Sequence, residues 1–158
     1  MDLSYKPYLE RANNEIKLAE IIMSLSKDKN LQLDIFKISP PETYFSSVIS
    51  HSDYAIFYSA KAYLLTKGIK TYVPEEHKKT YEEFKKFVEN GELNKELLEI
   101  YESIMIRADT LLDIFRTEKA KRGHFTYRKL PQANLFPAEE SLNNTKIFFK
   151  HINKLIGG

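Results

Sequence analysis

The segment from Glu42 to Lys67 is apolar on two sides when it is wound as an α-helix. Residues three and four positions apart share one face of a helix, so each side forms a stripe. The first stripe consists of Phe45, Val48, Ile49, Ala55, Ile56, Ala62 and Tyr63. The second stripe consists of Tyr54, Phe57, Tyr58, Leu64 and Leu65. A helix of this kind is either the central helix of a bundle or lies in both a core and an oligomer interface.

Four other segments show a single apolar stripe at helical spacing. The first runs from about Ser4 to Leu25, and its stripe consists of Leu9, Ala12, Ile16, Ala19 and Met23. A short helix spans about residues 75–90, a long one starts near Asn94, and the last one starts at Pro137. The stripe of the long helix consists of Leu97, Tyr101, Ile104, Ala108, Leu111 and Phe115.

The connections between these helices have their own signals. Gly68 and Gly123 are expected to end two of the helices, because glycine adopts the left-handed conformation of a C-terminal cap. Residues 31–38 alternate between apolar and polar side chains, which is the spacing of a strand. A single short strand would have no partner in this chain. We therefore interpret this stretch as an extended connection whose apolar side chains lie on the bundle.

These patterns predict one all-α domain, an up-and-down bundle of five helices that spans residues 1–158. Residues 1–41 form the N-terminal helix and the extended connection, and residues 42–158 form the core of the bundle. A chain of 158 residues is long enough to bury such a core. Its 5 glycines and 6 prolines are few, which favours long helices over tight turns.

The composition excludes several classes of function. The chain has no cysteine, so disulfides, thiolate catalysis and zinc–thiolate sites are excluded. It has no glycine-rich phosphate loop, no dinucleotide-binding motif and no Glu-x-x-His pair, so we expect no cofactor and no metal. No apolar run approaches the roughly 20 residues that span a bilayer, and no signal-peptide pattern is present. These observations predict a cytoplasmic protein that does not contact membranes.

Positive charge is concentrated in residues 116–129. This segment holds six Lys or Arg and one acid, Glu118, and so carries +5, whereas the whole chain carries +2. Helical steps from Phe115 place Glu118, Lys119 and Arg122 on the continuation of the buried stripe of the long helix. Charged groups on such a stripe have either left the core or are paired in a pocket. Both interpretations stay open on the pattern alone.

Several residues of this segment have side chains suited to RNA. His124 is either a general acid or base, as in cleavage at a 2′-hydroxyl, or a loop histidine without chemistry. Phe125 and Tyr127 either stack on nucleobases or pack the loop onto the bundle. Lys61, on an apolar face of the second helix, either reaches the surface or lines an anion pocket. The candidate ligand-binding residues are Lys119, Arg122, Arg128, Lys61, Glu118 and Arg116.

A family resemblance adds to these observations. Residues 52–69, with the sequence SDYAIFYSAKAYLLTKGI, resemble the second-helix motif of HEPN domains, and most closely that of their small stand-alone prokaryotic subgroup. Residues 138–156 are similar to the closing helix of that subgroup, and the likeness covers about residues 46–156. The resemblance implies a helical bundle, a homodimer and association with nucleotide or RNA. It also implies a partner, a minimal nucleotidyltransferase that forms a toxin–antitoxin pair with the bundle.

Active members of this family are metal-independent endoribonucleases whose motif is an Arg followed, after a short spacer, by a His. Arg122 matches the motif arginine, and Tyr127 stands in the place of the histidine. His124 comes too soon after Arg122 to match, and Gly123 stands where the motif has a polar side chain. The resemblance therefore favours binding over cleavage.

Three hypotheses follow. The first is a dimeric HEPN-like bundle that binds nucleotide or RNA phosphates, together with a nucleotidyltransferase partner. The second is a metal-independent endoribonuclease in which His124 or Tyr127 is the catalytic residue. The third is a non-catalytic protein-interaction module whose charges only keep it in solution.

Overall fold

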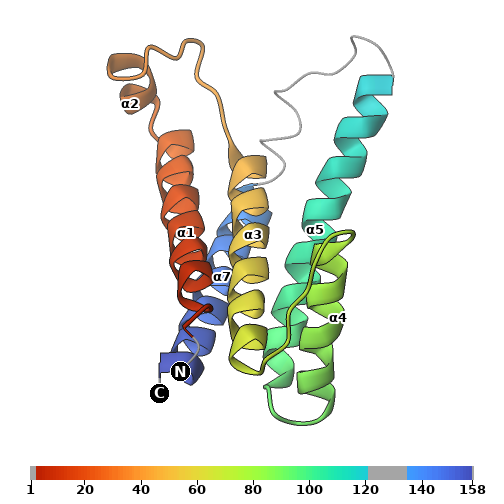
Figure 1. The fold of residues 1–158 in the computed structure, drawn as a ribbon. Helices are drawn as coiled ribbons and strands as arrows, with labels where there is room; N and C mark the ends of the chain where they lie inside the picture. The colour runs from red at the N-terminus through yellow and green to blue at the C-terminus, as the bar shows by residue number, and fades with distance from the viewer. Residues whose placement is uncertain (1–2, 121–134, 158) are drawn as a thin grey trace.

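The computed structural model describes residues 3–120 and 135–157, with side chains described for residues 3–111 and 135–157. Within these ranges every regular element is a helix, which confirms the all-α architecture. The helices are α1 (Lys6–Lys27), α2 (Lys29–Asp34), α3 (Phe45–Thr66), α4 (Glu76–Glu89), α5 (Lys95–Ala120) and α7 (Leu135–Gly157) (Figure 1). None of these helices is long and apolar enough to cross a membrane.

Helix α3 is the central helix of the bundle. It packs against α1, α4, α5 and α7, as Figure 1 shows. Both of its apolar stripes are largely buried, from Phe45 and Val48 near its start to Leu64 and Leu65 near its end. The first of the two interpretations of this segment, a central bundle helix, is therefore confirmed. Tyr54 is the exception within the second stripe, because its side chain is exposed.

The buried side chains form two clusters along α3. In the first cluster, the C-terminal half of α3 meets α4, α5 and α7, and Phe84 contacts the rings of Tyr63, Tyr101 and Phe148. In the second, the N-terminal half of α3 meets α1 and the start of α7. The predicted stripe of α1 belongs mainly to this second cluster, through Ile16, Ala19 and Met23. The helical spacing of the apolar residues thus predicted which faces of these helices pack in the core.

The connection between α1 and α3 differs from the sequence-based expectation. Residues Lys29–Asp34 form the short helix α2 rather than an extended segment, and the Asp28 side chain accepts a hydrogen bond from the Leu31 amide at 2.9 Å. This N-cap satisfies an amide that a helix start leaves free. The apolar side chains of Leu33, Ile35 and Phe36 are exposed. The prediction that these side chains cover the bundle is therefore wrong.

A buried amide ties this connection to the bundle instead. The side chain of Gln32 donates hydrogen bonds to the carbonyl oxygens of Leu25, at 2.7 Å, and Glu42, at 2.8 Å. Its own oxygen accepts from the Glu42 amide at 2.8 Å. A fully buried amide requires such partners, because an unpaired polar group is costly to remove from water. The polar residue of α2, and not its apolar neighbours, fixes the turn.

The loop after α3 brings the start of α4 back beside the middle of α3 (Figure 1). Gly68 has φ +74°, and the amide of Ile69 donates to the carbonyl of Leu64 at 2.9 Å, which confirms the predicted helix cap. The Thr71 and Thr80 hydroxyls lie 2.7 Å apart and fasten the loop to α4. Consequently Glu76 and His77, in the first turn of α4, contact side chains of α3.

Candidate functional site

The basic segment lies largely outside the described residues. Helix α5 continues to Ala120, so the backbone of residues 116, 118 and 119 is helical, as the spacing argument requires. The side chains of Arg116, Glu118 and Lys119 lie outside the described side chains. The other candidates of this segment lie outside the described residues altogether: Arg122, His124, Tyr127 and Arg128. Their roles therefore stay predictions.

Lys61 is the sequence-predicted candidate whose side chain is described, and it is buried, with 7% of its surface exposed. Its Nζ forms an ion pair with Glu76 and donates a hydrogen bond to the carbonyl of Thr71 at 3.1 Å. The ammonium also lies 5.1 Å from the ring centroid of Tyr8 and 5.8 Å from that of Phe57. Burial lowers the pKa of Lys61 below its ordinary value. This lysine thus joins α3 to the start of α4.

His77 covers the outer side of Phe57. The two rings are parallel within 7°, with centroids 3.8 Å apart, and the edge of His77 meets Tyr54 at 5.7 Å. Burial lowers the pKa of His77, and the charge of Lys61 lowers it further. Because the ordinary pKa of 6.5 is already below neutrality, this imidazole is uncharged at pH 7.

Beside this stack, a cleft of about 440 Å³ lies between α3, α4 and α5. Helix α3 contributes Asp53 and Phe57, and the other lining residues are His77, Lys78, Tyr81 and Glu82 of α4 and Tyr101, Met105 and Asp109 of α5. Its volume falls in the range of about 300–1,000 Å³ that is typical of small-ligand sites. The walls combine aromatic rings with carboxylates.

The electrostatics of the cleft centre on Asp53. Burial raises the pKa of this carboxyl, and the negative charge of Asp109 makes a smaller contribution. Together they raise it from 3.8 to about 7. A carboxyl with a pKa near neutrality is half-protonated in the cell's usual pH range. The pKa of Tyr101 is also raised, first by burial and then by Asp53. The cleft therefore disfavours negative charge.

Tyr81 has a partner on the neighbouring helix. Its hydroxyl donates a hydrogen bond to Oε1 of Glu102 at 2.6 Å, which links α4 to α5. Burial, followed by this hydrogen bond, raises the pKa of Tyr81 to about 12. The ring of Tyr81 is therefore held in place, and its hydroxyl already has a hydrogen-bond partner in Glu102.

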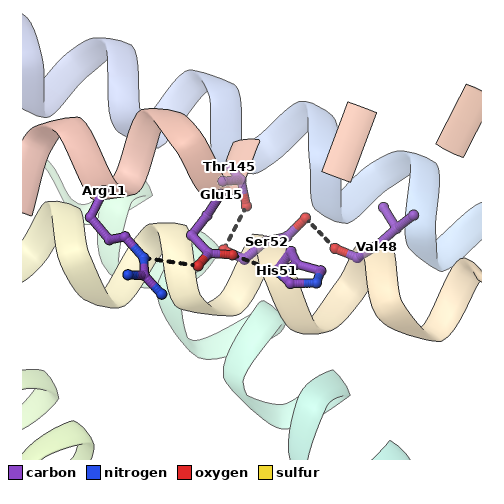
Figure 2. Close-up of polar contacts among 6 residues, drawn as sticks. All are labelled: Arg11, Glu15, Val48, His51, Ser52 and Thr145. Carbon is purple, nitrogen blue, oxygen red and sulfur yellow. Dashed lines mark hydrogen bonds and ion pairs between the residues drawn. The ribbon is translucent and has the colours of Figure 1, made fainter. Parts of the chain in front are cut away.

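A second polar cluster joins α1 to α3 and α7 (Figure 2). The buried Glu15 lies between Arg11 and His51, with its Oε2 2.5 Å from Nδ1 of His51. In the same region, the Thr145 hydroxyl of α7 donates to the Ser52 carbonyl at 3.3 Å. These contacts cross the interfaces between helices, so the cluster fixes how the helices pack.

Sequence reasoning did not identify the cleft. Asp53 and Asp109 are far apart in the chain, and only the packing of α3 on α5 brings them to one cavity. One local signal was present, because Asp53 interrupts a helix that is apolar on two sides. A carboxylate at such a position requires a partner or a raised pKa.

No protein-family model matches the chain, and no curated protein or solved structure shows a significant similarity to it.

Proposed function

We propose that the protein is a HEPN-like helical bundle that binds nucleotide or RNA phosphates through residues 116–129. The observation that supports this most is the charge of +5 in this segment, against +2 for the whole chain. Phosphate neutralisation by Lys and Arg supplies most of the affinity of a nucleic-acid-binding protein. Because α5 is helical as far as Ala120, the backbone of Arg116 and Lys119 belongs to its last turns. The resemblance of residues 52–69 to the HEPN motif points to the same class of ligand.

The cleft beside Asp53 is a poor site for phosphate. Two aspartates and Glu82 line it, and the pKa of Asp53 is already raised to about 7 by burial and Asp109. An added anion would raise the electrostatic cost further. Phosphate binding therefore belongs to the basic segment and not to the cleft.

The proposal includes the assembly that the resemblance implies. In a homodimer, the two copies of residues 116–129 would together carry a net charge of +10. A minimal nucleotidyltransferase is the proposed protein partner. Size-exclusion chromatography of the bundle alone tests the homodimer, which elution as a monomer would contradict. Co-expression with a minimal nucleotidyltransferase tests the partner, which separate elution of the two chains would contradict.

The binding test uses a fluorescein-labelled single-stranded RNA and fluorescence anisotropy. The logarithm of the affinity is expected to fall linearly with the logarithm of the salt concentration between about 50 and 200 mM, with a slope of about −0.7 for each phosphate neutralised. The double variant Lys119→Ala/Arg122→Ala should bind about tenfold more weakly and show a slope shallower by about 1.4. Lys95→Ala/Lys150→Ala removes two exposed cations elsewhere and is the matched control. Equal affinities for the two double variants would show that the assigned segment is not the site.

The ribonuclease hypothesis is decided with the same RNA. We expect the RNA to stay intact when it is incubated with pure protein in EDTA, because the HEPN motif histidine is replaced by Tyr127. Cleavage that disappears in His124→Ala or Tyr127→Phe would replace the binding proposal with a metal-independent endoribonuclease. The interaction-module hypothesis predicts instead no affinity for RNA at physiological salt.

A further inference from the structure

The cleft between α3, α4 and α5 has two kinds of wall. The rings of Phe57, Tyr81 and Tyr101 form an aromatic part, and the carboxyl groups of Asp53 and Asp109 form an acidic part. Aromatic faces attract cations electrostatically within about 6 Å, and carboxylates pair with them directly. We propose that this cleft binds a small organic cation, with an alkylammonium or guanidinium group lying between the rings and the two aspartates.

Tyr101 provides a polar atom that the described residues do not satisfy. Its side chain is only 3% exposed, and it lines the cleft. The Tyr81 hydroxyl donates to Glu102, whereas the described side chains provide no hydrogen-bond partner for the hydroxyl of Tyr101. Every fully buried side-chain polar atom that is described has a partner, so the Tyr101 hydroxyl opens into the cleft. There it is placed to accept a hydrogen bond from a cationic N–H group.

The charges around Asp53 favour a cationic ligand over a neutral or an anionic one. Asp109 and Tyr101 face it from α5, and the titratable groups of α4 in the cleft are His77, Lys78, Tyr81 and Glu82. His77 is uncharged at neutral pH because burial and Lys61 lower its pKa. A bound cation would compensate the negative charge of Asp53, which burial and the charge of Asp109 now oppose.

Lys78 is the cationic side chain of the lining, and it is exposed. Its positive charge beside the cleft opposes the binding of a second cation there. Removal of this side chain is therefore expected to increase the affinity of the cleft for a cation.

The site is independent of the phosphate-binding segment. Its residues lie within the described parts of α3, α4 and α5, and its charge has the opposite sign. An organic cation is recognised here by ring stacking and by paired carboxylates, which suit the planar guanidinium group in particular. The RNA-binding test and the cation test can each fail without affecting the other.

The test uses agmatine, which carries both a guanidinium and an ammonium group, and the full chain labelled with ¹⁵N. Titration at about pH 8 keeps Asp53 mostly ionised, since its pKa is about 7. Saturable amide shifts are expected around Asp53, Tyr81 and Tyr101. Asp109→Asn should weaken binding about tenfold, Tyr101→Phe severalfold, and Lys78→Ala should strengthen it. Asp109 and Lys78 are exposed, so these variants leave the core intact.

Three controls complete the experiment. Glu92→Gln removes an exposed carboxylate outside the cleft and should leave the affinity unchanged. Guanidinobutyrate, in which a carboxylate replaces the ammonium group of agmatine, should bind more weakly because of the two aspartates. Agmatine shifts that do not saturate, or that persist unchanged in Asp109→Asn, would overturn the proposal. Equal shifts with Mg²⁺ would also overturn it, because they would show a site selective for charge and not for an organic cation.

Discussion

Nδ1 of His51 on α3 lies 2.5 Å from Oε2 of Glu15 on α1. The other oxygen of the same carboxylate accepts a hydrogen bond from Nε of Arg11 at 3.2 Å. Glu15 is 7% exposed, so both oxygens take their hydrogen bonds mainly from protein groups and not from water (Figure 2). This carboxylate is a polar connection between α1 and α3, which both contribute to the second hydrophobic cluster.

Glu15→Gln is expected to lower the free energy of unfolding by about 1–3 kcal/mol. The amide keeps the shape of the carboxylate but has one acceptor oxygen in place of two, so the hydrogen bonds to Glu15 are weakened. Urea unfolding measures the loss. Glu20→Gln, on the same helix, breaks an exposed ion pair of 3.2 Å with Lys146 and should cost less than about 1 kcal/mol. Equal losses in the two variants would contradict a structural role for Glu15.

The stability of the protein should depend on the ionisation of Asp53. The pKa of this carboxyl is about 7 in the folded chain, against an ordinary value of 3.8, so between these pH values the folded state holds a proton that the unfolded state releases. The free energy of unfolding therefore falls as pH rises from about 4 to 7 and then levels off. Asp53→Asn, which resembles the protonated form, should flatten this part of the profile and be more stable than the natural chain at about pH 8.

The size of that effect follows from the shift. Each pKa unit corresponds to about 1.4 kcal/mol, so the gain in Asp53→Asn at pH 8 is on the order of a few kcal/mol. Urea unfolding across this pH range measures it, with the exposed Asp34→Asn on α2 as the control. A profile with the same slope in Asp53→Asn and the natural chain would show that another group controls it.

Lys61 and Glu76 should be strongly coupled. Lys61→Met leaves the Glu76 carboxylate and the Thr71 carbonyl without the ammonium that both contact, so a loss of about 2–3 kcal/mol is expected. In the double variant Lys61→Met/Glu76→Gln the loss should be smaller than the sum of the single losses. Lys67→Met breaks an exposed pair of 3.5 Å with Glu92 and should cost no more than about 1 kcal/mol. A Lys61→Met variant as stable as Lys67→Met would contradict the coupling.

The apolar faces of the long helices could be predicted from sequence because the burial of apolar side chains there follows helical spacing. Ile16, Ala19 and Met23 are buried in α1, and Leu97, Ile104 and Leu111 are buried in α5, as their periodicity indicated. Gly68 was predictable for a similar local reason, since its φ of +74° is costly for residues with a Cβ atom. Such signals need no knowledge of distant residues.

The polar contacts could not be predicted in the same way. Glu15 is a polar residue of α1, yet it is buried, because His51 of α3 and Arg11 are its partners there. Asp53 and Asp109 share a cleft only because α3 packs on α5. Pairings of this kind depend on the packed arrangement, which a pattern of apolar residues does not specify. For the basic segment the sequence pattern is clear, but most of its residues lie outside those that the structure describes.

Residues 31–38 show why an alternating pattern misled the prediction. The apolar side chains of Ile35 and Phe36 are exposed, and Gln32, which the pattern assigned to the polar side, is fully buried. Its amide forms three hydrogen bonds, to the Leu25 carbonyl and to the carbonyl and amide of Glu42. Gln32→Leu has a similar volume but leaves these three backbone groups without their partner. Because each unsatisfied buried group costs about 1–3 kcal/mol, a total loss of about 2–4 kcal/mol is expected after partial rescue by water.

The measurement combines urea unfolding with hydrogen exchange of single amides. In Gln32→Leu the amide of Glu42 should exchange faster, whereas the Tyr44 amide, which donates to the Ser26 hydroxyl at 2.8 Å, should keep most of its protection. Leu33→Gln, at the exposed neighbouring position, should change stability by no more than about 0.5 kcal/mol. If Leu33→Gln were the more damaging variant, the apolar side chains would hold this connection, as the alternating pattern first indicated. The opposite order is expected, because here a buried amide fixes the turn between α1 and α3.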